Sequence, residues 1–482
     1  MRQSAAGSEE TDTKKINFKV LSGYLIPFSL GLFFWLLPAP EGLDDLGWHM
    51  LIIFLSTLLG VMLAPAPMSA VTLVGLTVLG LTGTLSIKEA LSGYGDPVTW
   101  LSVLAFFISH GFIKTGLGMR IAYCFMRILG RRTLTLAYGL TLTDLLLAPA
   151  MPSITARAGA VVHPIMKSIA HIYDSHPGPT ANRLGRFLTL VVFHGNAITS
   201  GMFLTAMAGN PMILSLAGSQ GIEITWGSWA LAAIVPGIIS LIIMPLALYK
   251  LVPPEMTKTP GAVSLAKEKL AQLGPLKRDE WIMLVTFIVL LLLWVFGSGF
   301  GVVPTLVAML GVSLLILTGV LDWQDVIGNK GAWDTMIWFG AFITMAHYLS
   351  VYGVVQFTCD HVGGLFSGFS ASMTLLMLCV IYYLFHYFFA AATAQISAMY
   401  TSFLLIILAA GISPLGGALM LAFMSSLCGV ITHYGNGPAP ILFGAGYVSL
   451  GCWWFAGIIM SLLYLSIWLG PGILWLEWLG YL

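Results

Sequence analysis

The stretch Gly75 to Ile87, GLTVLGLTGTLSI, returns at an offset of 236 as Gly311 to Trp323, GVSLLILTGVLDW, and this pair decides the fold. Further matches follow in the same order along both halves. They join Ala105–Ser109 (AFFIS) to Ala341–Thr344 (AFIT), Pro152–Arg157 to Thr393–Ala398, and Gly209–Pro211 to Gly435–Pro438. The chain therefore contains two copies of one structural unit.

The composition is that of a protein whose solvent is lipid. Of the 482 residues 58% are hydrophobic and 9% are charged, and the mean hydropathy is +0.92; an ordinary soluble domain has about 25% charged residues. A soluble enzyme is excluded. The net charge of +1 offers no basic face for nucleic acid. The five cysteines are scattered singly without metal-ligand spacing, so we expect no disulfide framework, no metal site and no cofactor.

Eleven apolar stretches are each long enough to cross a bilayer, which takes about 20 residues. Two further regions, 133–172 and 370–408, are too long for one crossing and are interrupted by small and polar residues, so we interpret each as a re-entrant hairpin. The prediction is an all-α polytopic membrane protein. The eleven stretches are 21–37, 48–64, 68–85, 97–116, 187–216, 229–251, 281–297, 302–320, 334–354, 415–447 and 453–469.

Lysine and arginine gather in alternate loops, which fixes the expected sidedness because cytosolic loops carry their excess. The pattern places the amino terminus in the cytosol and the carboxyl terminus outside. We divide the chain into a cytosolic tail (1–20), a first helix with an outer loop (21–47), a first repeat (48–251) with hairpin 133–172, a cytosolic linker (252–280) and a second repeat (281–482) with hairpin 370–408.

The parity of the repeat points to transport. Five crossings separate the start of one unit from the start of the next, so the units lie upside down relative to each other. Inverted repeats are typical of secondary transporters, whose substrate binds near the midplane where helices are broken. Duplication retained for stability alone is the alternative. An anion channel would need a through-pore, and an intramembrane enzyme would need a nucleophile and base, but no GxSxG or HExxH motif occurs.

The candidate binding residues lie in four interruptions: the two hairpin tips and the breaks at 205–211 (TAMAGNP) and 432–440 (THYGNGPAP). Each interruption leaves helix amino ends that favour an anion such as a carboxylate, although glycine and proline could also merely kink packed helices. The predicted substrate-binding residues are Ser153, Thr155, Arg157, Asn210, Thr393, Gln395, Ser397, His433, Asn436 and Gly437.

Arg157 is the sharpest single feature, because a charge at bilayer depth costs about 2.5 to 3.5 kcal/mol on insertion scales and is normally kept for function. Its guanidinium could clamp a carboxylate with two hydrogen bonds. Alternatively, Asp144 on the other arm of the hairpin could neutralise it in a structural ion pair. We interpret most intramembrane histidines as packing residues, with His433 the exception because it lies in a break.

At these residues the sequence resembles the divalent anion:sodium symporter (DASS) family, and most of all its bacterial citrate or tartrate:succinate antiporters and plant oxoglutarate/malate translocators. The resemblance runs from about Trp48 to the carboxyl end, and its most specific parts are PSITAR at 152–157, HYFFA at 386–390 and THYGNGPAPILFGAGYV at 432–448. It implies eleven spans, two hairpins, a homodimer, an elevator motion and di- or tricarboxylate substrates, here in a bacterial inner membrane.

Both hairpin tips depart from the family pattern of sodium-coupled members, Ser-Asn-Thr. Ile154 replaces the first Asn, and Gln395 with Ile396 replaces the second Asn-Thr pair. Sodium prefers oxygen ligands, so apolar replacements beside Arg157 weaken such a site. A fixed guanidinium can do the electrostatic work of the ion, and the bare charge of an empty carrier then disfavours its return. We therefore predict one-for-one exchange of dicarboxylates; the alternative is sodium- or proton-coupled symport.

Overall fold

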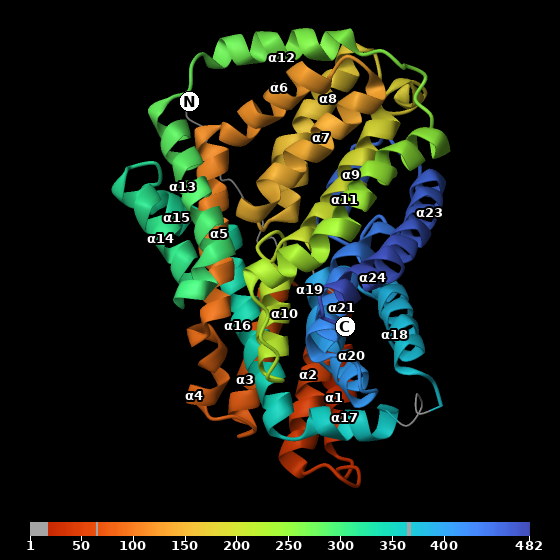
Figure 1. Cartoon of the computed structure of the whole chain (residues 1–482). Helices are drawn as coiled ribbons and strands as arrows, with labels where there is room; N and C mark the ends of the chain where they lie inside the picture. The colour runs from red at the N-terminus through yellow and green to blue at the C-terminus, as the bar shows by residue number, and fades with distance from the viewer. Residues whose placement is uncertain (1–17, 64–65, 364–367) are drawn as a thin grey trace, which may run out of the picture.

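The computed structural model describes residues 18–63, 66–363 and 368–482, and in these ranges the chain is helical apart from its loops and one isolated bridge between Arg132 and Lys258 (Figure 1). The predicted cytosolic tail lies almost wholly outside the described residues. The first helix, α1, spans Phe18–Trp35. The first repeat contains α2 (Asp45–Leu63), α3 (Met68–Leu81), α4 (Ile87–Ala90), α5 (Pro97–Thr115), α6 (Leu117–Leu129), α7 (Thr133–Leu147), α8 (His163–Ile172), α9 (Gly185–Met202), α10 (Gly209–Gly218) and α11 (Trp226–Leu251).

The second repeat contains the same succession of helices after the linker helix α12 (Pro260–Leu273). Short helices α4 and α15 correspond, and so do the two interrupted pairs, α9 with α10 and α21 with α22. The bounds are α13 (Arg278–Phe296), α14 (Pro304–Leu317), α15 (Trp323–Gly328), α16 (Lys330–Val351), α17 (Val354–Gly363), α18 (Ala371–Phe385), α19 (Ala392–Gln395), α20 (Thr401–Ala409), α21 (Pro414–Leu427), α22 (Pro438–Gly444), α23 (Leu450–Leu469) and α24 (Pro471–Trp478).

Within the described ranges, eight helical segments are long and apolar enough to cross a membrane, and four shorter apolar helices accompany them. Three of the eight are arms of the two hairpins, Thr133–Ala150, Ala371–Phe388 and Ala392–Ala409. The protein is thus a multi-pass, all-helical membrane protein. The number of complete crossings, eleven, stays a prediction.

The two hairpins enter from opposite ends of the molecule. Figure 1 shows α7 and α8 descending from the end that carries α12, whereas α18 and α20 rise from the end that carries α17, so both tips point toward the middle of the molecule. After its tip each hairpin continues in a π-helix, Ala156–Val162 in the first and Ile396–Tyr400 in the second. π-Helical turns are rare and concentrate at functional sites. Because one occurs at the same place in both hairpins, the two repeats are alike in local backbone geometry as well as in sequence.

The helices pack in two groups. In the α5 group, α5 contacts α14 and α16, and α3 contacts α2 and α16; in the α9 group, α9 contacts α7, α11 and α21, and α11 contacts α23. Figure 1 places α5, α13 and α14 on the left and α9, α11 and α23 on the right. Both repeats contribute to both groups, and the α9 group contains the two hairpins and the two breaks.

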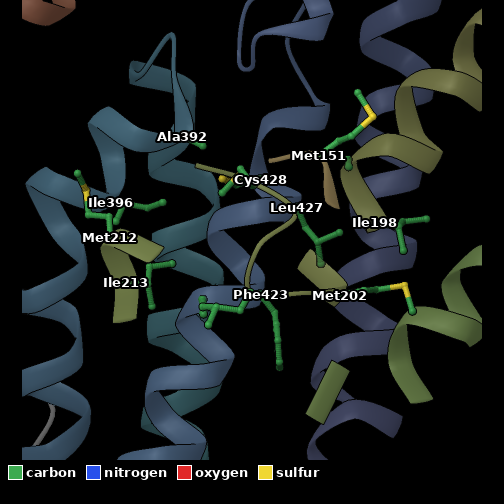
Figure 2. Close-up of a cluster of buried hydrophobic side chains, with 14 of the residues drawn as sticks. Met151, Ile198, Met202, Met212, Ile213, Ala392, Ile396, Phe423, Leu427 and Cys428 are labelled. Carbon is green, nitrogen blue, oxygen red and sulfur yellow. The ribbon is translucent and has the colours of Figure 1, made fainter. Parts of the chain in front are cut away.

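An apolar cluster fills the space between the hairpins and the breaks (Figure 2). Its side chains come from both repeats and all are buried, which fixes the interruptions to one another by close packing. Ile396 follows the second tip, Met212 and Ile213 follow the first break, and Phe423 and Leu427 come from α21. The labelled members are Met151, Ile198, Met202, Met212, Ile213, Ala392, Ile396, Phe423, Leu427 and Cys428.

Candidate functional site

The four interruptions touch each other across the two repeats. Gly437, in the second break, lies so close to the first tip that a Cβ atom there would overlap Thr155 Oγ1. Gly209, in the first break, lies against the second tip, where a Cβ atom would be 2.6 Å from Ile396 Cδ1 and 3.6 Å from Thr393 Cγ2. Each break therefore packs on the hairpin of the opposite repeat, and glycine is the residue that permits this approach.

Arg157 is wholly buried, and protein groups satisfy its guanidinium. Nε lies 3.3 Å from Asp144 Oδ1, and NH2 donates to Ser200 Oγ at 3.0 Å. NH1 donates to the backbone carbonyls of Met151, just before the first tip, and of Ala206, in the first break. The structural ion pair that the sequence allowed is therefore present, and the same guanidinium joins the hairpin to the break.

Asp144 has further partners on α9. Asn196 Nδ2 donates to its Oδ1 at 3.0 Å, and Thr199 Oγ1 donates to its Oδ2. Buried charges are tolerated when they are paired and hydrogen-bonded. Here the carboxylate and the guanidinium neutralise each other, so this part of the site carries little net charge.

His386 takes the corresponding place in the second repeat. Its Nε2 lies 2.7 Å from the carbonyl oxygen of Gly435, in the second break, and its Nδ1 lies 2.7 Å from Gln395 Oε1. The amide of Gln395 is held by Nε2 donating to Tyr382 O at 2.6 Å, which turns Oε1 toward the histidine. Both ring nitrogens thus face acceptors. A neutral imidazole donates only one such bond and the imidazolium donates both, while Gln395 Oε1 also accepts from the thiol of Cys428 at 3.2 Å.

Two asparagines form hydrogen bonds with backbone groups beside the breaks. Asn210 Nδ2 donates to the carbonyls of Ser200 at 2.8 Å and Phe203 at 2.9 Å, which lie before the first break. Asn436 Nδ2 reaches Gly429 O at 3.4 Å, and its Oδ1 accepts from Ala439 N at 3.1 Å. These amides replace backbone hydrogen bonds that the interruption removes, a need that is acute in lipid.

The ten predicted residues separate into two sets. Five are buried, and their polar groups are hydrogen-bonded to other protein groups. Among these five, Ser397 donates to Ala394 O at 2.9 Å within its own helix. The others remain partly or fully exposed, and the hydroxyls of Thr155 and Thr393 have no recorded partner among residues 18–63, 66–363 and 368–482. The buried set is Arg157, Asn210, Gln395, Ser397 and Asn436, and the accessible set is Ser153, Thr155, Thr393, His433 and Gly437.

Aromatic side chains hold His433 in a defined orientation. Trp454 Nε1 donates to His433 Nδ1 at 3.4 Å, and the ring of Phe443 lies 4.8 Å from the imidazole, centroid to centroid. Because an indole N–H can only donate, Nδ1 is the acceptor and the proton of the neutral ring lies on Nε2. A donor on Nε2 is therefore available beside the second break.

The sequence interpretation missed the role of His386, which it assigned to packing. Its signal was position: His386 lies shortly before the second tip, as Asp144 lies before the first, and it opens the HYFFA segment. The hydroxyl and amide groups of α9 that surround Asp144 were also missed, because nothing in a local pattern shows which helix will face the hairpin.

Known proteins are similar to this chain over nearly its whole length. The family model "Sodium:sulfate symporter transmembrane region" matches residues 19–482. The Bacillus subtilis (strain 168) protein YflS, provisionally named a malate transporter, is 48% identical over 475 residues, covering 98% of this chain and 99% of YflS. The chloroplastic dicarboxylate transporter 1 of Spinacia oleracea is 46% identical, covering 93% of this chain and 80% of that protein.

A solved structure shares the fold. The YdaH transporter of Alcanivorax borkumensis superposes with a TM-score of 0.54 and 13% sequence identity, covering 96% of this chain and 97% of that one. At that identity the match speaks for the fold alone. The match confirms the predicted fold class, and the family model and the curated relatives confirm the prediction of a transporter rather than an enzyme.

Proposed function

The chain belongs to the sodium:sulfate symporter family, the DASS family that its motifs resemble, and we propose that it transports dicarboxylates of the malate, 2-oxoglutarate and succinate class by one-for-one exchange. The names of its relatives support the substrate class. Citrate and tartrate remain within the proposed range. The second candidate is sodium- or proton-coupled symport of the same anions.

One observation favours exchange over sodium symport. In each of the two breaks, a fixed side chain already lies within hydrogen-bond distance of a backbone carbonyl oxygen. In transporters with broken helices, unwound backbone carbonyls coordinate the coupling cation. Here Arg157 donates hydrogen bonds to the carbonyl oxygens of Met151 and Ala206, and His386 Nε2 is hydrogen-bonded to the carbonyl oxygen of Gly435. A sodium ion would have to displace these side chains, because they already bind the carbonyl oxygens that would coordinate it.

The electrostatic balance differs between the two halves. Asp144 compensates Arg157, so the guanidinium by itself does not leave the empty carrier positively charged. A protonated His386 would be the uncompensated charge, because its ring is buried and faces neutral acceptors only. In an empty site that charge would move between the two faces of the membrane unpaired, whereas in a loaded site it lies beside an opposite charge, so return without substrate is unfavourable.

The accessible residues are the proposed substrate contacts. Ser153, Thr155 and Thr393 offer hydroxyls at the two tips, and His433 Nε2–H offers a donor at the second break. One carboxylate would lie at each tip. We further propose an elevator motion in which the α9 group slides along the α5 group, a homodimer, and a bacterial inner membrane with the amino terminus in the cytosol.

The deciding experiment is counterflow in proteoliposomes. Vesicles loaded with malate should take up labelled 2-oxoglutarate or succinate when choline replaces all sodium, and empty vesicles should not take up label under a sodium gradient. Sodium-driven uptake into empty vesicles would establish symport and reject the proposal. A proton gradient imposed without sodium tests the remaining coupling, and vesicles without protein provide the baseline.

A further inference from the structure

Helix α6 has two unlike faces. On the inner face Arg120 forms a two-point ion pair with Glu280 of α13, with Nε–Oε1 at 2.6 Å and NH2–Oε2 at 2.9 Å, and NH1 donates to Gly274 O. The outer face is half-buried to exposed and carries Ile121, Cys124 and Ile128, which helical spacing places side by side, and Ile128 is 71% exposed. An amphipathic helix with such a face is typical of the membrane interface.

Four cations surround the end of this outer face. Arg127 lies on α6, Arg131 and Arg132 lie in the turn that follows, and the isolated bridge places Lys258 of the linker opposite Arg132. All four are exposed. Among the described residues, no acidic side chain lies within ion-pair distance of these four, which we call the basic turn, and their side chains make no recorded hydrogen bond.

The backbone of the basic turn is rigidly held although its side chains are free. Thr259 donates from its backbone N–H to Arg131 O at 2.9 Å and from its hydroxyl to Gly130 O at 2.8 Å. Thr133 N donates to Thr257 O at 3.1 Å. Like charges directly opposite each other are destabilising, so the fold holds four cations together against their repulsion with no anion of its own.

We propose that the basic turn and the apolar face of α6 bind an anionic phospholipid of the bilayer. The phosphate would lie among Arg127, Arg131, Arg132 and Lys258, and acyl chains would lie along Ile128 and Ile121. Charge complementarity selects the acidic headgroup, and the adjacent apolar face selects a lipid over a soluble anion. Because α6 connects α5 to α7, the lipid would bind where the chain passes between the two helix groups.

The experiment measures binding and does not depend on transport. Full-length protein in neutral detergent is titrated with phosphatidylglycerol or phosphatidylcholine, and bound lipid is counted by native mass spectrometry while unfolding temperature is followed. Phosphatidylglycerol should bind and raise the unfolding temperature more than phosphatidylcholine. Because each interfacial cation is worth about 1 kcal/mol, the double variant Arg127→Gln/Arg131→Gln should weaken phosphatidylglycerol binding about thirtyfold.

A matched pair on α12, Lys267→Gln/Lys269→Gln, removes the same charge from the same end of the molecule without an exposed apolar face beside it. It should leave binding unchanged, and equal weakening by both pairs would overturn the proposal in favour of general attraction. Ile128→Ser should weaken binding while inorganic phosphate should not substitute for the lipid; phosphate acting equally well would also overturn it. If the α6 pair instead dissociates a dimer regardless of lipid, the face is a subunit interface and the lipid proposal is wrong.

Discussion

The two hairpins have the same backbone plan and different chemistry. In the first, a buried Arg157–Asp144 pair holds the carbonyl of Ala206; in the second, His386 braced by Gln395 holds the carbonyl of Gly435. What the halves share is the contact between a cationic donor and the break of the same repeat, not the residue that makes it. The first half is self-neutralising, whereas the second depends on protonation of a ring. The comparison therefore places in the second half the group that, when protonated, would attract an anionic substrate.

The variant that should affect the first hairpin most is Arg157→Ala. It leaves the Asp144 carboxylate buried and unpaired, and removal of one member of a buried pair costs about 3 to 5 kcal/mol. We expect a large fall in the unfolding temperature and loss of exchange. Thermal unfolding in detergent and counterflow measure the two effects.

The matched double variant Arg157→Gln/Asp144→Asn is neutral on both sides and should be more stable than Arg157→Ala. Equal instability of the two variants would mean that packing, and not charge, dominates. A further variant, Arg157→Ser, also frees two carbonyls beside a carboxylate, so any exchange that it retains should become sodium-stimulated; lithium and choline serve as controls.

In the second half the corresponding change is His386→Phe. It leaves Gly435 O without the donor that His386 supplies, while Gln395 Oε1 keeps only the thiol of Cys428 at 3.2 Å, and an unpaired buried acceptor costs about 1 to 3 kcal/mol. The loss should be smaller than for Arg157→Ala because no bare charge remains. His386→Gln keeps one donor and should lose less; identical losses for both variants would argue that His386 acts by volume alone.

The contact between the repeats can be tested by Gly437→Ala. The new methyl would overlap Thr155 Oγ1, and overpacking of this kind costs about 1 to 3 kcal/mol. Adding Thr155→Ala removes that atom, and the remaining Cβ lies 3.5 Å away, so the double variant should recover stability although it loses one proposed substrate hydroxyl.

Gly209→Ala is the counterpart in the other repeat. Its nearest neighbour is the flexible end of Ile396, so it should cost less than Gly437→Ala. Chemical unfolding and the KM for malate separate stability from binding in this series. Without recovery in the double variant, the contact between Gly437 and Thr155 would not be what limits the site.

The smallest expected effect is that of Trp454→Phe. It removes a hydrogen bond of 3.4 Å to His433 Nδ1, worth below about 1 kcal/mol, so the KM for substrate should rise less than about fivefold with kcat preserved. His433→Gln, which retains a donor, should resemble it. A fall in kcat with unchanged KM would place His433 in the motion and not in binding.

Much of the architecture was predictable because it depends on local rules. The predicted hairpins, 133–172 and 370–408, agree with the observed helices to within a residue, and the predicted break at 205–211 separates α9 from α10. The site was predictable only as a set of interruptions. Asn210 and Gln395, which the sequence predicts to contact substrate, also have protein partners that the sequence did not reveal, since whether an amide faces inward depends on neighbours far along the chain.

The sequence alone determined the number of repeats, their opposite orientation and the places where helices break. These follow from the length of apolar segments, from the parity of crossings and from glycine and proline, all of which act within a few turns of helix. Only the tertiary structure decided which donors meet which carbonyls, such as His386 with Gly435 and Arg157 with Ser200. Those pairs are 49 and 43 residues apart within one repeat, and they form because each hairpin packs against the broken helix of its own unit, which no local pattern encodes.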